Sequence, residues 1–436
     1  MERKRHLWPR KSWHLPVDKT TGQAAWMLIA IGASGFLNYA ANIGVGKLLG
    51  PAKYGVYASL LAIFLIFYAL IGIIQTTVAS HVSHVLATDP RSGIRLLLKH
   101  LLGRLLPLGL LGAFAFALVS PALARFLHIA SLSPVIIVGC SLVPAVGLPV
   151  VCGILQGQQR FGVLGGLMIL AAGLRLVLSL GLIYAGFDVA GAVASLPLHL
   201  LCPFALGLVA LTRTSSCCGE IDVDLELGAM YRSSLYISAS SISFMILTNM
   251  DMIVVKSLSA PLQAGYYAAI ANLGKIVLHL PDAVTALLLP KASQRYAMKR
   301  SSRDLLRISL MAVGLMCGGV ILFFWLFPSF TVGLLFGQEY LAGTYLLGPY
   351  GLAMGFYVLA GVWLYYYIAV RDARYSYLLV VGVVVQAALL GICRANLSSV
   401  VLALLCTSLL LFLSGEILLR FPRSPLQAEP GPVSES

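Results

Sequence analysis

The chain has 436 residues, of which 59% are hydrophobic and only 11% charged, and its formal net charge is +14. Soluble globular proteins carry about 25% charged residues. The low fraction of charged residues, together with a mean hydropathy of +0.91, therefore excludes a soluble globular protein.

Twelve apolar stretches are long enough to cross a bilayer, for which an α-helix needs about 20 residues. The connections between them are short, so no sizeable soluble domain fits. The sequence predicts an all-α integral membrane protein with about twelve transmembrane helices. In chain order these stretches lie at 24–46, 55–80, 103–124, 133–156, 162–186, 188–212, 231–256, 264–290, 305–327, 341–369, 375–393 and 397–419.

The basic N-terminal tail, residues 1–23, precedes the first apolar stretch. A signal peptide would join such a tail to a short apolar core with a small-residue cleavage site. Here the apolar stretch has about 23 residues and no such site follows a short core. We therefore expect a retained first helix.

Lys and Arg residues divide unequally between the two sides of the membrane. With both termini in the cytoplasm, 23 of the 30 fall on the cytoplasmic side and five on the other. This asymmetry follows the positive-inside rule. It predicts a multi-pass protein with both termini cytoplasmic, and it explains the basic net charge without nucleic acid as a partner.

An acidic loop after the sixth span divides the chain into two halves. We interpret this loop as a solvated linker, with a partner-binding site as the alternative. The predicted organisation is a cytoplasmic basic tail, a six-helix N-lobe, a cytoplasmic acidic linker, a six-helix C-lobe and a disordered cytoplasmic tail. These segments lie at 1–23, 24–212, 213–230, 231–419 and 420–436.

The two halves resemble one another between their first and second spans. Aligning ANIGVGKLLGPAKYGVYASL (41–60) with NMDMIVVKSLSAPLQAGYYAAI (249–270) sets Asn42 opposite Asp251 and, after one inserted residue, GVYA opposite GYYA. Because six is an even number of spans, the halves would share one orientation. This predicts a parallel repeat, a transporter plan that places the binding site between two lobes.

Several motifs resemble those of the polysaccharide-transport flippases in the multidrug/oligosaccharidyl-lipid/polysaccharide exporter superfamily. The resemblance covers about 20–420 as architecture. It is carried by Arg175 in the fifth span and by LGPAKYGVYA (49–58), LQGQQRFG (155–162), D…AGYYAA…K (251–275) and LLLPKAS (287–293).

The resemblance implies two parallel six-helix lobes around a central cavity, often cationic, with lateral openings for a lipid tail. It implies a flippase that moves a lipid-linked oligosaccharide or polysaccharide precursor, a polyprenyl-pyrophosphate glycan, across the cytoplasmic membrane by alternating access. The expected context is lipopolysaccharide or exopolysaccharide biosynthesis. The expected partners are the lipid-linked glycan, membrane lipid and other polysaccharide-assembly proteins.

Two cations fall near the middle of apolar stretches, Arg175 in the fifth and Lys275 in the eighth. A charge at the bilayer centre costs about 3 kcal/mol on insertion scales, so such residues usually face a protein interior or a watery cavity. They could bind the diphosphate of an anionic substrate. The alternative is structural, in which each cation pairs with an acid or with backbone carbonyls to fix helix packing.

Polar residues follow one face of the eighth span. Lys275, His279 and Asp282 are spaced i, i+4 and i+7, and Asn272 extends the same stripe. Pro281 should kink the helix beside them. The pattern predicts a mobile helix that lines a cavity, and the alternative is neutralisation of Lys275 by Asp282 within the helix.

Asp251 is the one acid deep in the seventh span, where Asn249 accompanies it. A buried carboxylate is costly unless it is paired, protonated or bound to a cation. Asp251 could pair with Lys275, bind a coupling Na⁺ or H⁺, or lie at a helix end without a special role. The sequence leaves the coupling ion open.

Three amide side chains in the first two spans could hydrogen-bond the sugar of the substrate or link helices. These candidates are Asn38, Asn42 and Gln75.

The nearest alternative is a cation-coupled multidrug-type exporter of the same superfamily, although the deep positive charges would oppose organic cations. A membrane glycosyltransferase or polymerase is a more distant alternative, since such enzymes carry large external loops with acidic residues. No catalytic constellation, cofactor motif or spaced metal-ligand set stands out. We therefore expect a transporter without enzyme activity or cofactor.

Overall fold

A computed structural model describes most of the chain. The described residues are 17–88, 94–214, 223–279, 303–370, 372–392 and 396–420, together with Ala292, Arg295 and Met298. Every regular element among them is a helix, and no strand occurs in this part of the chain.

The first half of the chain forms seven helical elements. These are α1 (Val17–Thr88), α2 (Ile94–Phe126), α3 (Ser133–Cys140), α4 (Leu142–Gly157), α5 (Phe161–Leu182), the π-helical turn η1 (Ile183–Phe187) and α6 (Asp188–Thr214).

The second half follows with a similar series. Its described elements are α7 (Val223–Leu258), α8 (Pro261–Gly274), α9 (Ile276–His279), α11 (Arg303–Leu326), α12 (Pro328–Leu335), the 3₁₀-helix η2 (Gln338–Leu346), α13 (Leu347–Ala369), α14 (Arg374–Ile392) and α15 (Leu397–Arg420).

Eleven of the twelve predicted spans are present in the described part of the chain, although some are joined. Nine segments of the described chain are long and apolar enough to cross a membrane. Two of them double back, at Gly50 (φ 70°) and at Gly186 (φ 89°), so each supplies two spans. The remaining span begins with α8 and α9. Positive φ is open to glycine at no steric cost, which explains why the chain reverses at these two residues.

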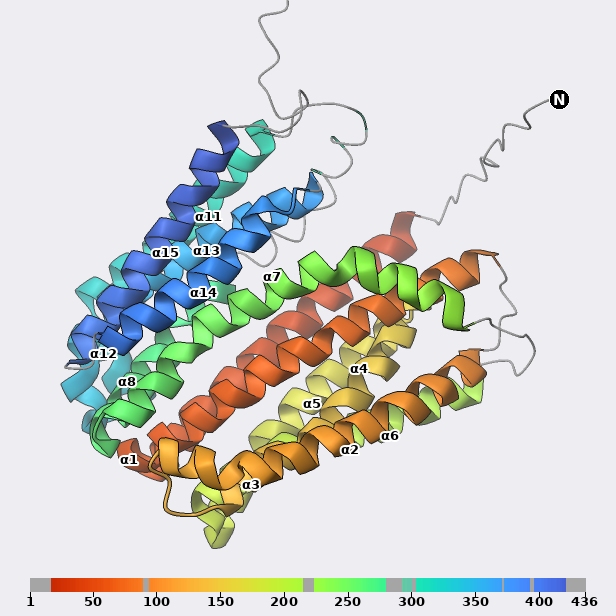
Figure 1. Cartoon of the computed structure of the whole chain (residues 1–436). Helices are drawn as coiled ribbons and strands as arrows, with labels where there is room; N and C mark the ends of the chain where they lie inside the picture. Colours follow the sequence, from red (N-terminus) through yellow and green to blue (C-terminus); the bar gives the residue numbers. More distant parts are fainter. Residues whose placement is uncertain are drawn as a thin grey trace, which may run out of the picture.

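The helices gather into two lobes (Figure 1). In the N-lobe α5 packs on α1 and α6, and in the C-lobe α13 packs on α11 and α15. The fourth span of each lobe is its buried centre. In Ser133–Gly157 and Gln338–Ala369, 78% and 72% of an apolar 18-residue stretch is buried, compared with at most 50% in the other described spans. This matching position supports the predicted repeat.

The lobes touch where α1 turns at Gly50 and α8 begins, and we call this side of the molecule the Gly50 end (Figure 1). A side chain at Gly55 would meet the backbone nitrogen of Gly265 at 2.9 Å, so the two backbones are nearly in contact. Tyr340 of the C-lobe also donates a hydrogen bond of 2.7 Å to the carbonyl of Gly46 in the N-lobe. The Gly50 end is therefore closed by direct packing of one lobe on the other.

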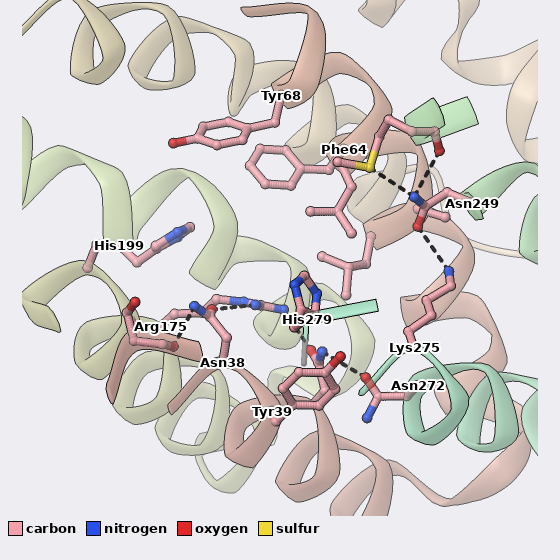
Figure 2. Close-up of a pocket in the computed structure, with 18 of the residues that line it drawn as sticks. Asn38, Tyr39, Phe64, Tyr68, Arg175, His199, Asn249, Asn272, Lys275 and His279 are labelled. Atoms are coloured by element: carbon pink, nitrogen blue, oxygen red, sulfur yellow. Dashed lines mark hydrogen bonds between the residues drawn. The ribbon is translucent and has the colours of Figure 1, made fainter. Parts of the chain in front are cut away.

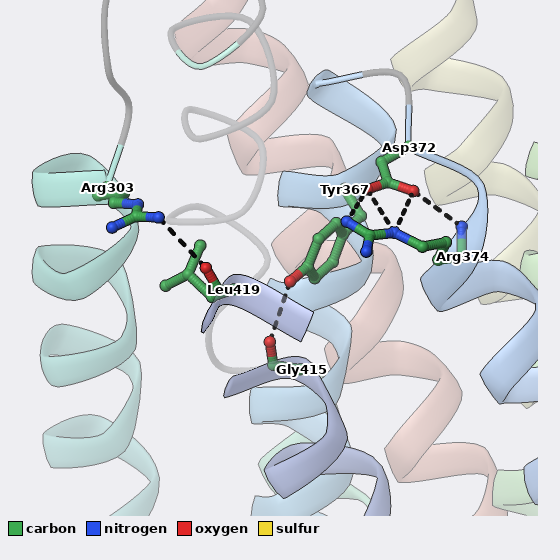
Figure 3. A network of polar contacts seen from close by, with 6 residues as sticks. All are labelled: Arg303, Tyr367, Asp372, Arg374, Gly415 and Leu419. Atoms are coloured by element: carbon green, nitrogen blue, oxygen red, sulfur yellow. Dashed lines mark hydrogen bonds and ion pairs between the residues drawn. The ribbon is translucent and has the colours of Figure 1, made fainter. Parts of the chain in front are cut away.

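A second group of polar contacts lies at the beginnings of α11 and α14 and at the end of α15 (Figure 3). Arg374 binds both carboxylate oxygens of Asp372, with Nη2 2.7 Å from Oδ2 and Nε 3.1 Å from Oδ1. Arg303 donates to the carbonyl of Leu419 at 3.2 Å. The last carbonyls of a helix lack partners within it, so this arginine caps α15 and ties it to α11.

Candidate functional site

A cavity of about 680 Å³ lies between the lobes. Helices α1, α5 and α6 of the N-lobe and α7, α8 and α9 of the C-lobe contribute its lining (Figure 2). Of the ten predicted site residues, eight line this one cavity: Asn38, Asn42, Gln75, Arg175, Asn249, Asn272, Lys275 and His279. Asp251 does not line it, and Asp282 lies outside the described residues.

Arg175 lies in the middle of α5 with only 7% of its surface exposed. Its guanidinium donates from Nη1 to Oδ1 of Asn38 at 2.7 Å, and from Nη2 to Oδ1 of Asn42 at 2.7 Å and Oη of Tyr57 at 2.9 Å. All these partners come from α1 and are neutral. The charge of Arg175 is thus held in place, with no acid among its hydrogen-bond partners in the described chain.

Asn42 connects this N-lobe network to the C-lobe. Its Oδ1 accepts from Arg175 and from Oη of Tyr57, which lies 3.3 Å away. Its Nδ2 donates to Oδ1 of Asn272 on α8 at 3.0 Å. Asn42 and Asn272 therefore act as an interlobe link within the cavity wall.

Lys275 lies at the break between α8 and α9, where it serves as the C-cap residue of α8. Its Nζ donates to Oδ1 of Asn249 at 3.0 Å. Asn249 is oriented by α7 itself, because its Nδ2 donates to the carbonyl of Met245 at 2.9 Å. Lys275 thus places a second cation on the C-lobe side of the cavity, opposite Arg175 (Figure 2).

Asp251 is completely buried within the C-lobe. Its Oδ2 accepts hydrogen bonds from Tyr267 at 2.7 Å and Tyr350 at 3.0 Å. Asp251 and Lys275 therefore bind other partners, so the ion pair that was one interpretation of the sequence is not formed. The second oxygen, Oδ1, has no hydrogen-bond partner among the described residues.

The tyrosines that bind Asn42 and Asp251 occupy equivalent positions of the internal repeat. Tyr57 lies in GVYA and donates to Asn42, and Tyr267 lies in GYYA and donates to Asp251. The aligned sequences paired these residues without showing that they touch. The same contact in both halves supports a parallel repeat.

His279 contacts Tyr39 of α1 edge to face, with ring centroids 6.0 Å apart. Gln75 donates from Nε2 to Oε1 of Gln156 on α4 at 3.1 Å. Gln75 thus links two N-lobe helices, while its surface still borders the cavity.

His199 of α6 was missed by sequence reasoning. It lines the cavity, and its Nδ1 lies 2.8 Å from the carbonyl of Ser195. A carbonyl only accepts, so Nδ1 carries the hydrogen and a neutral ring has its lone pair at Nε2. A histidine inside an otherwise apolar span was the available signal.

The part of the cavity away from the Gly50 end is lined by apolar and aromatic side chains, among them Phe64, Leu65, Tyr68, Leu164 and Leu167. The lining follows α1 from Tyr54 to Gln75, which corresponds to about 30 Å of helix. The site therefore combines a polar, cationic region with a long apolar region. Among the described residues, no group of three His, Cys, Asp or Glu side chains could hold a metal ion.

Known structures share this fold across nearly the whole chain. An inward-facing multidrug resistance MATE family transporter of the MOP superfamily has a TM-score of 0.77 at 16% identity, covering 88% of this chain and 94% of its own. The lipid II flippase MurJ, in an inward closed conformation, has a TM-score of 0.72 at 12% identity, covering 90% and 87%. A MOP superfamily transporter from Pyrococcus furiosus, described as having a binding pocket of reverse polarity, has a TM-score of 0.63 at 17% identity, covering 91% and 94%.

At these identities the likeness establishes the fold, with twelve spans in two lobes. No curated protein matches the chain in sequence. A family model described as polysaccharide biosynthesis protein matches residues 44–344, well over half of the chain and including both cavity cations. The two-lobe fold is shared with transporters described as members of the MOP superfamily, and by its sequence the chain belongs to this family of polysaccharide biosynthesis proteins.

Proposed function

We propose that the protein is a flippase that moves a lipid-linked oligosaccharide or polysaccharide precursor across the cytoplasmic membrane by alternating access. The substrate class is a polyprenyl diphosphate carrying a glycan. The observation that carries this proposal is Arg175, a buried cation in the interlobe cavity whose hydrogen-bond partners are all neutral.

A buried charge is costly, and pairing with an acid is the usual way to lower that cost. Arg175 is instead surrounded by amides and a hydroxyl, so its charge can act on a ligand. A guanidinium binds phosphate oxygens through two parallel hydrogen bonds, and such bonds are strong where water is scarce. Lys275 supplies a second positive group on the facing lobe.

The remainder of the cavity fits the other parts of the same substrate. Amide groups of Asn38, Asn249 and Asn272 line it and can bind sugar hydroxyls. The apolar region around Phe64 and Leu167 can accept the start of a polyprenyl chain. The family's description supports a role in polysaccharide biosynthesis, and a structural neighbour is a flippase of lipid II.

A multidrug exporter is the competing function, since several structural neighbours are described as multidrug transporters. Its usual substrates are organic cations. Arg175 and Lys275 would repel them across the same cavity, and the Pyrococcus furiosus neighbour is itself described as having reversed pocket polarity. Charge therefore favours the anionic lipid.

The test is transport by the purified protein in proteoliposomes. A fluorescent polyprenyl-diphosphate sugar is placed in both leaflets, and dithionite destroys the fluorescence of the accessible leaflet. We expect loss of nearly all fluorescence with the wild type and of about half with protein-free vesicles. Equal loss in both would reject the flippase, and protein-dependent uptake of ethidium in its place would establish the multidrug function.

A further inference from the structure

Asn42 and Asn272 form a side-chain hydrogen bond between the lobes inside the cavity, 3.0 Å from Nδ2 to Oδ1. The link joins α1 to α8, the two helices that also meet at the Gly50 end (Figure 1). An amide pair at this place must separate if the lobes are to move apart here.

The orientation of the Asn42 amide is set by the N-lobe. Guanidinium groups only donate hydrogen bonds. The oxygen of Asn42 must therefore face Arg175 at 2.7 Å, and it also accepts from Tyr57. With the oxygen so fixed, only Nδ2 is left for Asn272. Arg175 thus acts as a positioning residue for the interlobe bond.

Asn272 has little else to hold it. Its own Nδ2 is buried and has no hydrogen-bond partner among the described residues. Its Oδ1 binds only Asn42 in the same part of the chain. The link is therefore a single hydrogen bond. Its geometry depends on the contacts that Asn42 makes with Arg175 and Tyr57.

We propose that this bond is a latch released by the phosphate groups of the substrate. The inference rests on the proposed function, in that it takes the anion to bind at Arg175. A phosphate would engage Nε, which has no hydrogen-bond partner among the described residues, together with Nη2, which now donates to Asn42 and Tyr57. Charged oxygens are stronger acceptors than neutral amides. A bound phosphate therefore draws the guanidinium away from Asn42, whose amide can then turn and lose Asn272.

The consequence is control over when the lobes separate. Without substrate, Arg175 keeps Asn42 in the orientation that binds Asn272, and this bond adds to the packing that closes the Gly50 end. With an anionic headgroup in the cavity, the latch opens and the lobes can part. Without bound substrate, the transporter would then seldom change between its conformations.

The test measures lobe separation by double electron–electron resonance in the full-length protein. Spin labels are placed at Ser131, in the turn between α2 and α3, and at Tyr345 in η2, both exposed. The native cysteines are replaced beforehand. Farnesyl diphosphate is the probe, and farnesol is its uncharged match.

In the wild type we expect farnesyl diphosphate, and not farnesol, to raise the fraction of separated lobes at least threefold. Asn272→Leu removes the acceptor without touching Arg175. It should separate the lobes without ligand and respond little to further ligand. Farnesyl diphosphate carries no sugar for Asn272 to bind, so the variant should bind this probe within about threefold of the wild type.

Two further variants keep the test decisive. Asn272→Asp retains an acceptor and adds charge, so it should hold the lobes closed and weaken the response to ligand. Gln75→Leu is the matched control, because it breaks an amide–amide bond that stays within the N-lobe. Its distances should equal those of the wild type.

The outcomes separate the two proposals. If farnesyl diphosphate binds in an Arg175-dependent way but the lobes do not respond, the latch is wrong and the proposed function stands. Ligand-free distances in Asn272→Leu that match the wild type also overturn the latch. If farnesyl diphosphate does not bind the wild type, both the proposed function and the trigger of the latch fail.

Discussion

Gln386 of α14 and Arg175 of α5, each in the fifth span of its lobe, donate hydrogen bonds to residues that the repeat alignment sets opposite one another. Arg175 donates to the side chain of Asn38, and Gln386 donates from Nε2 to the carbonyl of Leu247 at 2.9 Å. The aligned repeat sets Asn38 opposite Leu247. In each lobe a buried donor of the fifth span therefore binds the same aligned position of the first span, and of these two donors only Arg175 is charged.

Arg175→Gln follows from this comparison, because the C-lobe already packs a buried glutamine in its fifth span. We expect normal membrane levels and a transport rate reduced at least tenfold. Hydrogen bonds to charged groups contribute about 1.5–3 kcal/mol, which is roughly 10- to 100-fold in binding. Flipping of a fluorescent polyprenyl-diphosphate sugar in proteoliposomes measures the change.

Arg175→Lys is the control for charge alone. Lysine has one point-like donor group and cannot span the three acceptors that Arg175 reaches with two nitrogens. We expect it to recover only a small part of the rate. Wild-type flipping by Arg175→Gln would show that the cavity needs no cation here.

Asp251→Leu should destabilise the C-lobe. Two buried tyrosine hydroxyls, from Tyr267 and Tyr350, would lose their acceptor. Each unsatisfied group costs about 1–3 kcal/mol, so we expect a loss of about 2–6 kcal/mol in unfolding free energy. Thermal unfolding of the purified protein in detergent reports this as a lower midpoint.

Asp251→Asn is the matched variant, since it keeps an oxygen for both hydroxyls while removing the charge. It should lose less stability than Asp251→Leu. It also tests coupling: if Asp251 binds a driving Na⁺ or H⁺, the variant's transport rate should no longer respond to either gradient. An unchanged response would leave Asp251 with a packing role only.

The sequence predicted the helices, and eight of its ten candidate residues line one cavity, because both predictions depend on local composition. Apolar length located the twelve spans, and the rarity of charges in them singled out Arg175 and Lys275. The hydrogen-bond partners of the buried polar residues could not be predicted in the same way. Asp251 is bound by Tyr350, 99 residues later in the chain, and this contact depends on how α13 packs on α7. His199 was missed because a single histidine in a span is a weak signal. Only the structure shows that it lines the same cavity as Arg175.

Cysteine labelling tests the predicted orientation. With both termini in the cytoplasm, single cysteines at Ala52 and Gln338 should react with an impermeant reagent applied to intact cells. Gln159, exposed in the turn between α4 and α5, should react only after the membrane is opened. All three lie on the protein surface, so access depends on the side of the membrane. Labelling of Gln159 in intact cells would reverse the topology.

Gly55→Ala tests whether contact of the lobes at the Gly50 end is needed for transport. The added methyl group would lie 2.9 Å from the backbone nitrogen of Gly265, too close for the lobes to keep their present spacing. Backbone atoms cannot move aside as a flexible side chain would, so we expect spin labels at Ser131 and Tyr345 to move apart and flipping to fall at least tenfold. Gly72→Ala on the same helix is the control, because no atom lies within 4 Å of the added group. Equal distances and equal rates in the two variants would show that the approach of Gly55 to Gly265 does not close the transporter.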